Sequence, residues 1–202
     1  WFDTSAQSYA DQIAEHNDSA QFYRHTGLHI SYKASLAKLL WLKNTEPEIL
    51  DNTVWLSVAD YIAYRLTGEY ATDYSLAGRT GAYDIYQKRW DAPTLEQWGL
   101  PSGLFPPACA SGEIMGETTS VCQAFGIPSG IPVAISGHDH ICAALVAQQA
   151  EPQTVFDSMG TAEVLIGAYP HRELSDADYQ SGLLSGCHLL DQHNYWLGSL
   201  SS

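Results

Sequence analysis

Two stretches of the chain place apolar residues at the spacing of an amphipathic helix. In residues 35–43 (SLAKLLWLK), Leu36, Leu39 and Leu40 lie three and four positions apart. Residues 56–66 (LSVADYIAYRL) repeat this spacing, and the Thr-Gly pair that follows is typical of a helix end. We therefore predict a helix in each stretch.

Weaker patterns predict the remaining elements. Helices are expected at residues 5–17, 93–98, 118–125 and 139–149. Strands are expected at residues 78–86 and 131–136, and then at 153–158, 161–169, 180–188 and 193–199. Because helices alternating with strands give way to strands alone near residue 150, we predict an α/β or α+β protein of two lobes, residues 1–150 and 151–202.

The charge balance limits the classes of partner. The 202 residues include 23 Asp and Glu against nine Lys and Arg, which gives a formal net charge of −14. Nucleic acids and anionic membranes require basic patches, so neither is expected as a partner. A small polyhydroxylated ligand is compatible with this charge, and so is ATP, because backbone N–H groups can bind phosphate.

Cysteine usage and the chain ends add two expectations. The four cysteines are scattered without a C-x-x-C pair, which favours a reducing cytoplasmic location. The apolar run at residues 141–147 is too short to cross a bilayer. The chain starts at Trp1 without an initiator Met, so we expect an internal piece of a longer protein. A homodimer is compatible with the sequence.

The tetrad Gly137-His138-Asp139-His140 joins a predicted strand to a predicted helix. Open α/β sheets place their ligand sites at such junctions. A carboxylate at a helix N-terminus can accept a proton from an attacking hydroxyl, so Asp139 is a candidate general base. The alternative is that Asp139 only caps the helix.

The two histidines of the tetrad raise the question of a metal site. Positions i and i+2 of a helix face different directions, and no second cluster has ligand spacing, so we predict no metal site here. We expect His140 to line a polar pocket and His138 to make a local hydrogen bond. A metal-dependent hydrolase using His138, Asp139 and His140 is the least favoured alternative.

A second candidate motif is DSMGTAE at residues 157–163. Its Gly160-Thr161 turn can offer backbone N–H groups and a hydroxyl to a phosphate, although the same residues also make ordinary hairpin turns. A candidate base at the end of one lobe and such a turn at the start of the next are the layout of a phosphoryl transferase.

Four stretches, in order along the chain, resemble the FGGY family of carbohydrate kinases. They are WFD at 1–3, SLAKLLWLKN at 35–44, SVADYIAYRLTGEYATDYSLAGRT at 57–80, and GIPSGIPVAISGHDHICAAL with DSMGTAEVL within 126–165. The resemblance implies an actin-like ATPase, ribonuclease H-like fold of two lobes, with only part of each present. Residues 1–150 would end the N-terminal, sugar-binding lobe, and residues 151–202 would begin the C-terminal, nucleotide-binding lobe.

The same resemblance implies an ATP- and Mg²⁺-dependent kinase acting on a sugar or polyol. Asp139 would be the catalytic base, Gly160 and Thr161 would contact the nucleotide phosphates, and Trp1 and His140 would contact the sugar. The family's N-terminal phosphate loop and its adenine-binding region would lie outside the chain, so we expect this piece alone to be inactive. The alternative is a non-catalytic sugar-binding or regulatory protein on the same scaffold.

Two further groups have structural interpretations. Four tryptophans, at positions 41, 55, 90 and 98, are expected to pack in or against the core. Asp73 and Arg79 are expected to hold the entry to the strand at 78–86 through hydrogen bonds and an ion pair.

Overall fold

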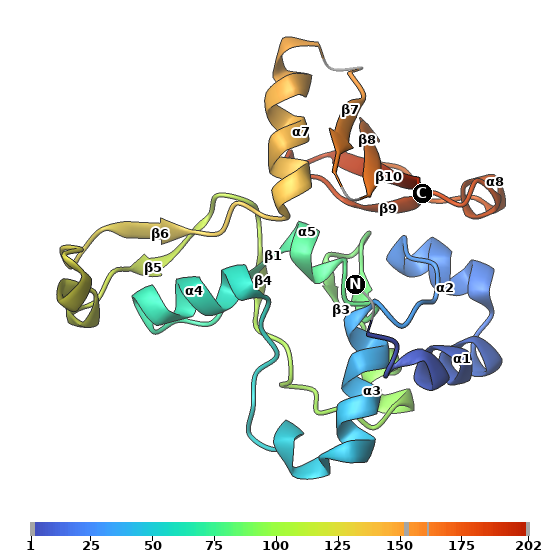
Figure 1. Cartoon of the computed structure of the whole chain (residues 1–202), viewed down its shortest axis with the longest axis horizontal. Coiled ribbons are helices and arrows are strands. Elements are labelled where there is room, and N and C mark those ends of the chain that lie inside the picture. Colours follow the sequence, from blue (N-terminus) through green and yellow to red (C-terminus); the bar gives the residue numbers. More distant parts are fainter. Residues whose placement is uncertain (1–2, 152–153, 161, 201–202) are drawn as a thin grey trace.

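A computed structural model describes residues 3–151, 154–160 and 162–200 of the chain. Helix α7 (Asp139–Ala150) stands beside a four-stranded sheet at one end of the molecule, and most of the other helices lie at the opposite end (Figure 1). Among the described residues, no helix is long and apolar enough to span a membrane.

The first half of the chain is mainly helical. Its helices are α1 (Gln7–His16), α2 (Ser19–Thr26), α3 (Ser35–Thr45), the 3₁₀-helix η1 (Pro47–Leu50), α4 (Val58–Thr67), α5 (Tyr74–Ala77) and α6 (Ala92–Gln97). The helices predicted at 5–17, 35–43, 56–66 and 93–98 are confirmed. Helix α2 is short and lacked a clear apolar period, so it was not predicted.

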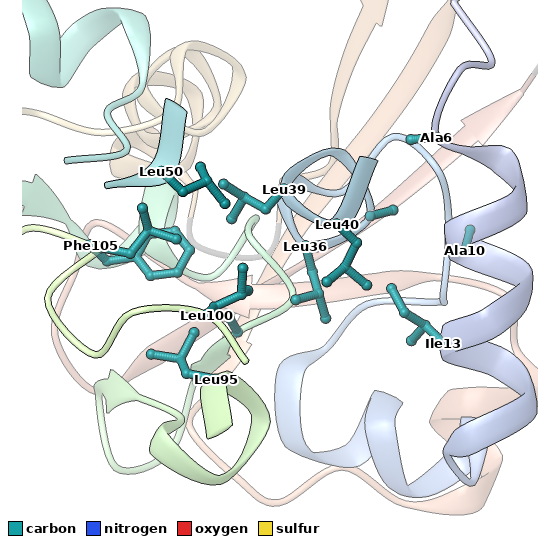
Figure 2. Close-up of a cluster of buried hydrophobic side chains, with 13 residues drawn as sticks. Ala6, Ala10, Ile13, Leu36, Leu39, Leu40, Leu50, Leu95, Leu100 and Phe105 are labelled. Atoms are coloured by element: carbon teal, nitrogen blue, oxygen red, sulfur yellow. The ribbon is translucent and has the colours of Figure 1, made fainter. Parts of the chain in front are cut away.

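Helices α1, α3, η1 and α6 enclose one apolar core, which Figure 2 shows in close-up. The predicted α3 stripe is its centre, because Leu36, Leu39 and Leu40 are all at most 6% exposed. All four tryptophans predicted to pack do so, partly buried against this core. Trp90 stacks on Phe105 with ring centroids 4.2 Å apart.

Three two-stranded sheets accompany these helices. Strand β1 (Thr72–Asp73) runs parallel to β4 (Ala108–Cys109), and β2 (Tyr83–Asp84) is antiparallel to β3 (Arg89–Trp90). Strands β5 (Ile114–Glu117) and β6 (Pro132–Ala134) form an antiparallel pair that extends away from the rest of the molecule (Figure 1). Between them lies the 3₁₀-helix η2 (Ser120–Phe125).

The end of the chain forms a sheet that packs against α7. Strands β7 (Phe156–Met159), β8 (Glu163–Pro170), β10 (His193–Leu200) and β9 (Leu184–Cys187) lie in that order, and every neighbouring pair is antiparallel. The short helix α8 (Asp176–Gln180) precedes β9. Ile141 and Ala144 of α7 bury against the sheet residues Val164, Ile166 and Tyr195.

Three predicted elements were partly wrong. Residues 78–86 are mostly turn, with only two residues in β2, because Asp73 caps the short helix α5 immediately before them. The helix predicted at 118–125 is 3₁₀ rather than α. Residues 180–188 are strand only at 184–187, because a Ser175–Asp178 capping box starts α8 just before them.

The helical part and the terminal sheet meet in a second core that spans the predicted boundary at residue 150. Its buried members are Tyr23, Ala77, Tyr83, Ile85, Leu174 and Cys187. At its edge, the Ser185 N–H donates to the Gly27 carbonyl at 2.8 Å, and a Cβ on Gly27 would lie 2.3 Å from the Ser185 carbonyl oxygen. The sheet is therefore in direct backbone contact with the end of α2. The division into two lobes stays a prediction.

Candidate functional site

Asp139 is the first residue of α7, and its carboxylate is 85% exposed. One carboxylate oxygen accepts the backbone N–H of His140 at 2.8 Å. The N-cap position belongs to His138, so the interpretation of Asp139 as the cap residue is wrong. The carboxylate instead projects from the first turn of α7, where a ligand can reach it.

The His138 side chain lies mostly buried beside this carboxylate. Burial is the main cause that lowers its pKa from 6.5 to about 4, and the positive charge of Arg79 adds to the effect, while Asp139 opposes it. The imidazole is therefore neutral at pH 7. Its Nδ1 lies 3.1 Å from the Asp139 Oδ1 but has no hydrogen-bond partner among the described residues, so the expected local hydrogen bond of this side chain is not formed.

A tight turn at Gly137 sets the direction of α7. Gly137 has a φ of +107°, and a Cβ built there would lie 2.4 Å from Leu189 Cδ2, 2.6 Å from Ser75 Oγ and 2.8 Å from Asp73 Oδ1. Only glycine accommodates both this backbone conformation and these neighbours. Residues from strand β1, helix α5 and the loop between β9 and β10 therefore surround the turn that precedes Asp139.

Ser75 and Asp73 are site residues that the sequence analysis did not recognise. The Ser75 hydroxyl accepts the His138 backbone N–H at 3.0 Å and donates to the Asp73 carboxylate. Asp73 also caps α5, as it accepts the Ser75 N–H at 2.7 Å. The Asp-x-Ser spacing signals a helix cap in sequence, but the contact with residue 138 has no local signal.

The ion pair expected between Asp73 and Arg79 is absent from the described part of the chain, so that prediction is wrong. The buried Arg79 Nη1 has no hydrogen-bond partner among the described residues. Arg79 and His138 instead line a cavity of about 310 Å³, together with Asp60 and the aromatic rings of Trp55, Trp90 and Phe105.

The remaining predicted site residues are only partly described. His140 is half-buried, with its ring 5.7 Å from that of His138. Gly160 is exposed in the turn between β7 and β8, where its N–H donates to the Ala162 carbonyl at 3.3 Å, so this segment is a hairpin turn. Trp1 and Thr161 lie outside the described residues.

The described residues provide few candidates for metal ligands. None of their His, Cys, Asp and Glu side chains form a group of three or more that could hold a metal ion. The described residues therefore do not by themselves form a Mg²⁺ site.

Several solved structures that superpose on this chain are carbohydrate kinases. A xylulose kinase from Rhodospirillum rubrum superposes with a TM-score of 0.86 over 96% of this chain and 39% of its own, at 25% identity. A glycerol kinase from Plasmodium falciparum has a TM-score of 0.82 over the whole chain and 41% of its own, at 19% identity, which shows the fold alone. The predicted actin-like ATPase fold, present in part, is thereby confirmed.

Residues 1–146 match the N-terminal domain of the FGGY family of carbohydrate kinases, and the chain belongs to that family. It is 37% identical over 134 residues to L-fuculokinase of Escherichia coli K12, and 29% identical over 130 residues to autoinducer-2 kinase of an Enterobacter species. These matches cover 65% and 63% of the chain but only 28% and 24% of the relatives. The chain thus spans about a quarter of the length of these relatives.

Proposed function

We propose that the full-length protein phosphorylates a sugar hydroxyl with ATP, and that Asp139 is the general base. The observation that carries this proposal is the exposed Asp139 carboxylate at the start of α7, behind a turn that only glycine can make. Family membership supports phosphoryl transfer to a sugar as the reaction.

In the proposed reaction, the attacking sugar oxygen forms a bond to the γ-phosphorus while the bond between that phosphorus and the bridging oxygen of ADP breaks. Asp139 accepts the hydroxyl proton as the bond forms. Because the neighbouring His138 imidazole is neutral, it does not compete for this carboxylate as an ion-pair partner.

The other roles follow the family pattern. We assign Trp1 and His140 to the sugar, and Gly160 and Thr161 to the nucleotide phosphates, with Mg²⁺ accompanying ATP. An exposed glycine in a hairpin turn allows the close approach that a phosphate requires, which supports the assignment of Gly160. Residues 1–150 would then contribute to the sugar-binding lobe, and residues 151–202 would begin the nucleotide-binding lobe.

The substrate test is a panel assay of the full-length protein with Mg-ATP. L-fuculose comes first, because the relative at 37% identity is an L-fuculokinase, followed by xylulose, glycerol and gluconate. ADP release that requires one sugar supports the kinase. ATP binding without turnover on any sugar would favour the alternative of a sugar-binding or regulatory protein.

The base is tested by Asp139→Asn in the full-length protein. We expect kcat to fall by about 10²- to 10⁴-fold, the usual contribution of general-base catalysis, with sugar affinity by calorimetry nearly unchanged. The matched control is Asp51→Asn, which neutralises an exposed carboxylate after η1 and should leave kcat unchanged. Wild-type turnover in Asp139→Asn would refute the assignment.

A further inference from the structure

We infer that Ser75, held by Asp73, positions the candidate base by fixing the backbone of residues 137 and 138. This inference rests on the proposed function of Asp139. It assigns a role in catalysis to two side chains that are distant in sequence from Asp139.

The first observation is the direction of the hydrogen bonds. Ser75 and Asp73 are each 1% exposed. Because the Ser75 hydroxyl donates its proton to the Asp73 carboxylate, its oxygen is free to accept the His138 backbone N–H, which it does at 3.0 Å. Asp73 is itself held by the N–H groups of Ser75 at 2.7 Å and Leu76 at 3.3 Å. A rigid cap of α5 therefore holds the residue that precedes Asp139.

The second observation is the way in which α7 begins. His138 occupies its N-cap position but makes no capping hydrogen bond through its side chain within the described part of the chain. Its backbone N–H is bound by Ser75, and Ser75, Asp73 and Leu189 crowd the Cα of Gly137. The start of this helix is therefore set by tertiary contacts instead of by a local cap.

A positioning role predicts a particular kinetic pattern. Loss of the Ser75 hydroxyl leaves the His138 N–H without its acceptor, so the turn can shift and take the Asp139 carboxylate with it. A base displaced by a fraction of an ångström still meets the sugar but no longer faces the hydroxyl in the reactive geometry. The effect should therefore fall on kcat much more than on KM.

The test is Ser75→Ala in the full-length protein, assayed with Mg-ATP and L-fuculose, or with the panel sugar that gives the highest rate. We expect kcat to fall on the order of 10- to 100-fold, with the KM for the sugar changed by less than about threefold. A kcat within about twofold of wild type would overturn the inference.

The matched control is Ser185→Ala. The Ser185 side chain is equally buried, in a residue 2% exposed, and its hydroxyl donates to the Tyr195 carbonyl at 3.0 Å in the terminal sheet. We expect this variant to lose thermal stability as Ser75→Ala does, while kcat stays within about twofold of wild type. An equal loss of kcat in both variants would show a general structural effect and would overturn the inference.

Two parallel measurements keep the result interpretable. If Ser75→Ala does not fold, the isosteric Asp73→Asn weakens the anchor of the hydroxyl while keeping an acceptor for the α5 cap. It should lower kcat by roughly threefold to tenfold at unchanged KM, and wild-type kcat would overturn the inference. Asp139→Asn is assayed alongside: if it is inactive while Ser75→Ala is unaffected, only the positioning role fails, whereas an active Asp139→Asn refutes the proposed base itself.

Discussion

Helices α4 and α7 begin in different ways. At α4, Ser57 and Asp60 form a capping box, with the Ser57 N–H donating to Asp60 at 2.9 Å and the Asp60 N–H donating to Ser57 at 3.1 Å. At α7, the backbone N–H of the N-cap residue is bound by Ser75, 63 positions earlier in the chain. A local cap makes the start of a helix independent of the rest of the fold, whereas a distant contact links it to another element.

This difference matches the roles that we assign to the two helices. Helix α4 packs beside β5 and β6 (Figure 1), and we assign its residues no part in the reaction, although Asp60 lines the cavity that His138 also lines. Helix α7 carries Asp139 in its first turn, directly after a turn that β1, α5 and the loop between β9 and β10 enclose. A site built from elements distant in sequence requires its position to be defined by tertiary contacts.

The largest effect is expected from Gly137→Ala. The new Cβ would lie 2.4 Å from Leu189 Cδ2 at a φ of +107°, so both the backbone and its neighbours must move. We expect a loss of about 2–4 kcal/mol in the free energy of unfolding, measured from the urea midpoint of the full-length protein. The control is Gly68→Ala at the end of α4, where the new Cβ would meet no described atom within 4 Å beyond its own chain neighbours. It should cost no more than about 1–2 kcal/mol, and equal losses would refute the special role of the Gly137 turn.

The next effect is a pH dependence at His138. Its folded pKa of about 4 lies below the ordinary 6.5, so the unfolded chain binds more protons between these values. The contribution of His138 to the free energy of unfolding is fully present above pH 6.5 and is lost as the pH falls towards 4. The free energy of unfolding then changes by up to about 1.4 kcal/mol per pH unit. We compare the urea midpoints of wild type and His138→Asn between pH 4.5 and 7. As the pH falls, the wild-type midpoint should decrease more than that of the variant. Parallel curves would contradict the buried neutral imidazole.

The smallest effect is expected from Ser57→Ala. It removes a local cap and should cost about 1 kcal/mol of stability, because one backbone N–H of α4 loses its acceptor. Unlike Ser75→Ala, it should leave kcat unchanged in the full-length kinase assay. A kcat loss similar to that of Ser75→Ala would remove the contrast between the two helix starts.

Local patterns predicted much of the fold. The α3 stripe of Leu36, Leu39 and Leu40 led to a correct helix and to the centre of the core, because apolar residues at helical spacing must bury one face. The strand assigned to 78–86 failed because the cap made by Asp73 competes with extended pairing, and apolar alternation does not report that competition.

For the candidate site, the sequence by itself determined which residue types are present and which elements carry them: an aspartate after a glycine turn at the start of a helix, in a family of sugar kinases. Only the tertiary structure decided that Asp139 follows the cap instead of being it, that His138 is buried and neutral, and that Ser75 and Leu189 enclose the Gly137 turn. The physical reason is the distance along the sequence over which each interaction acts. Helix propensity, capping and amphipathic spacing act within a few residues, whereas burial, pKa and this hydrogen bond depend on segments that only folding brings together.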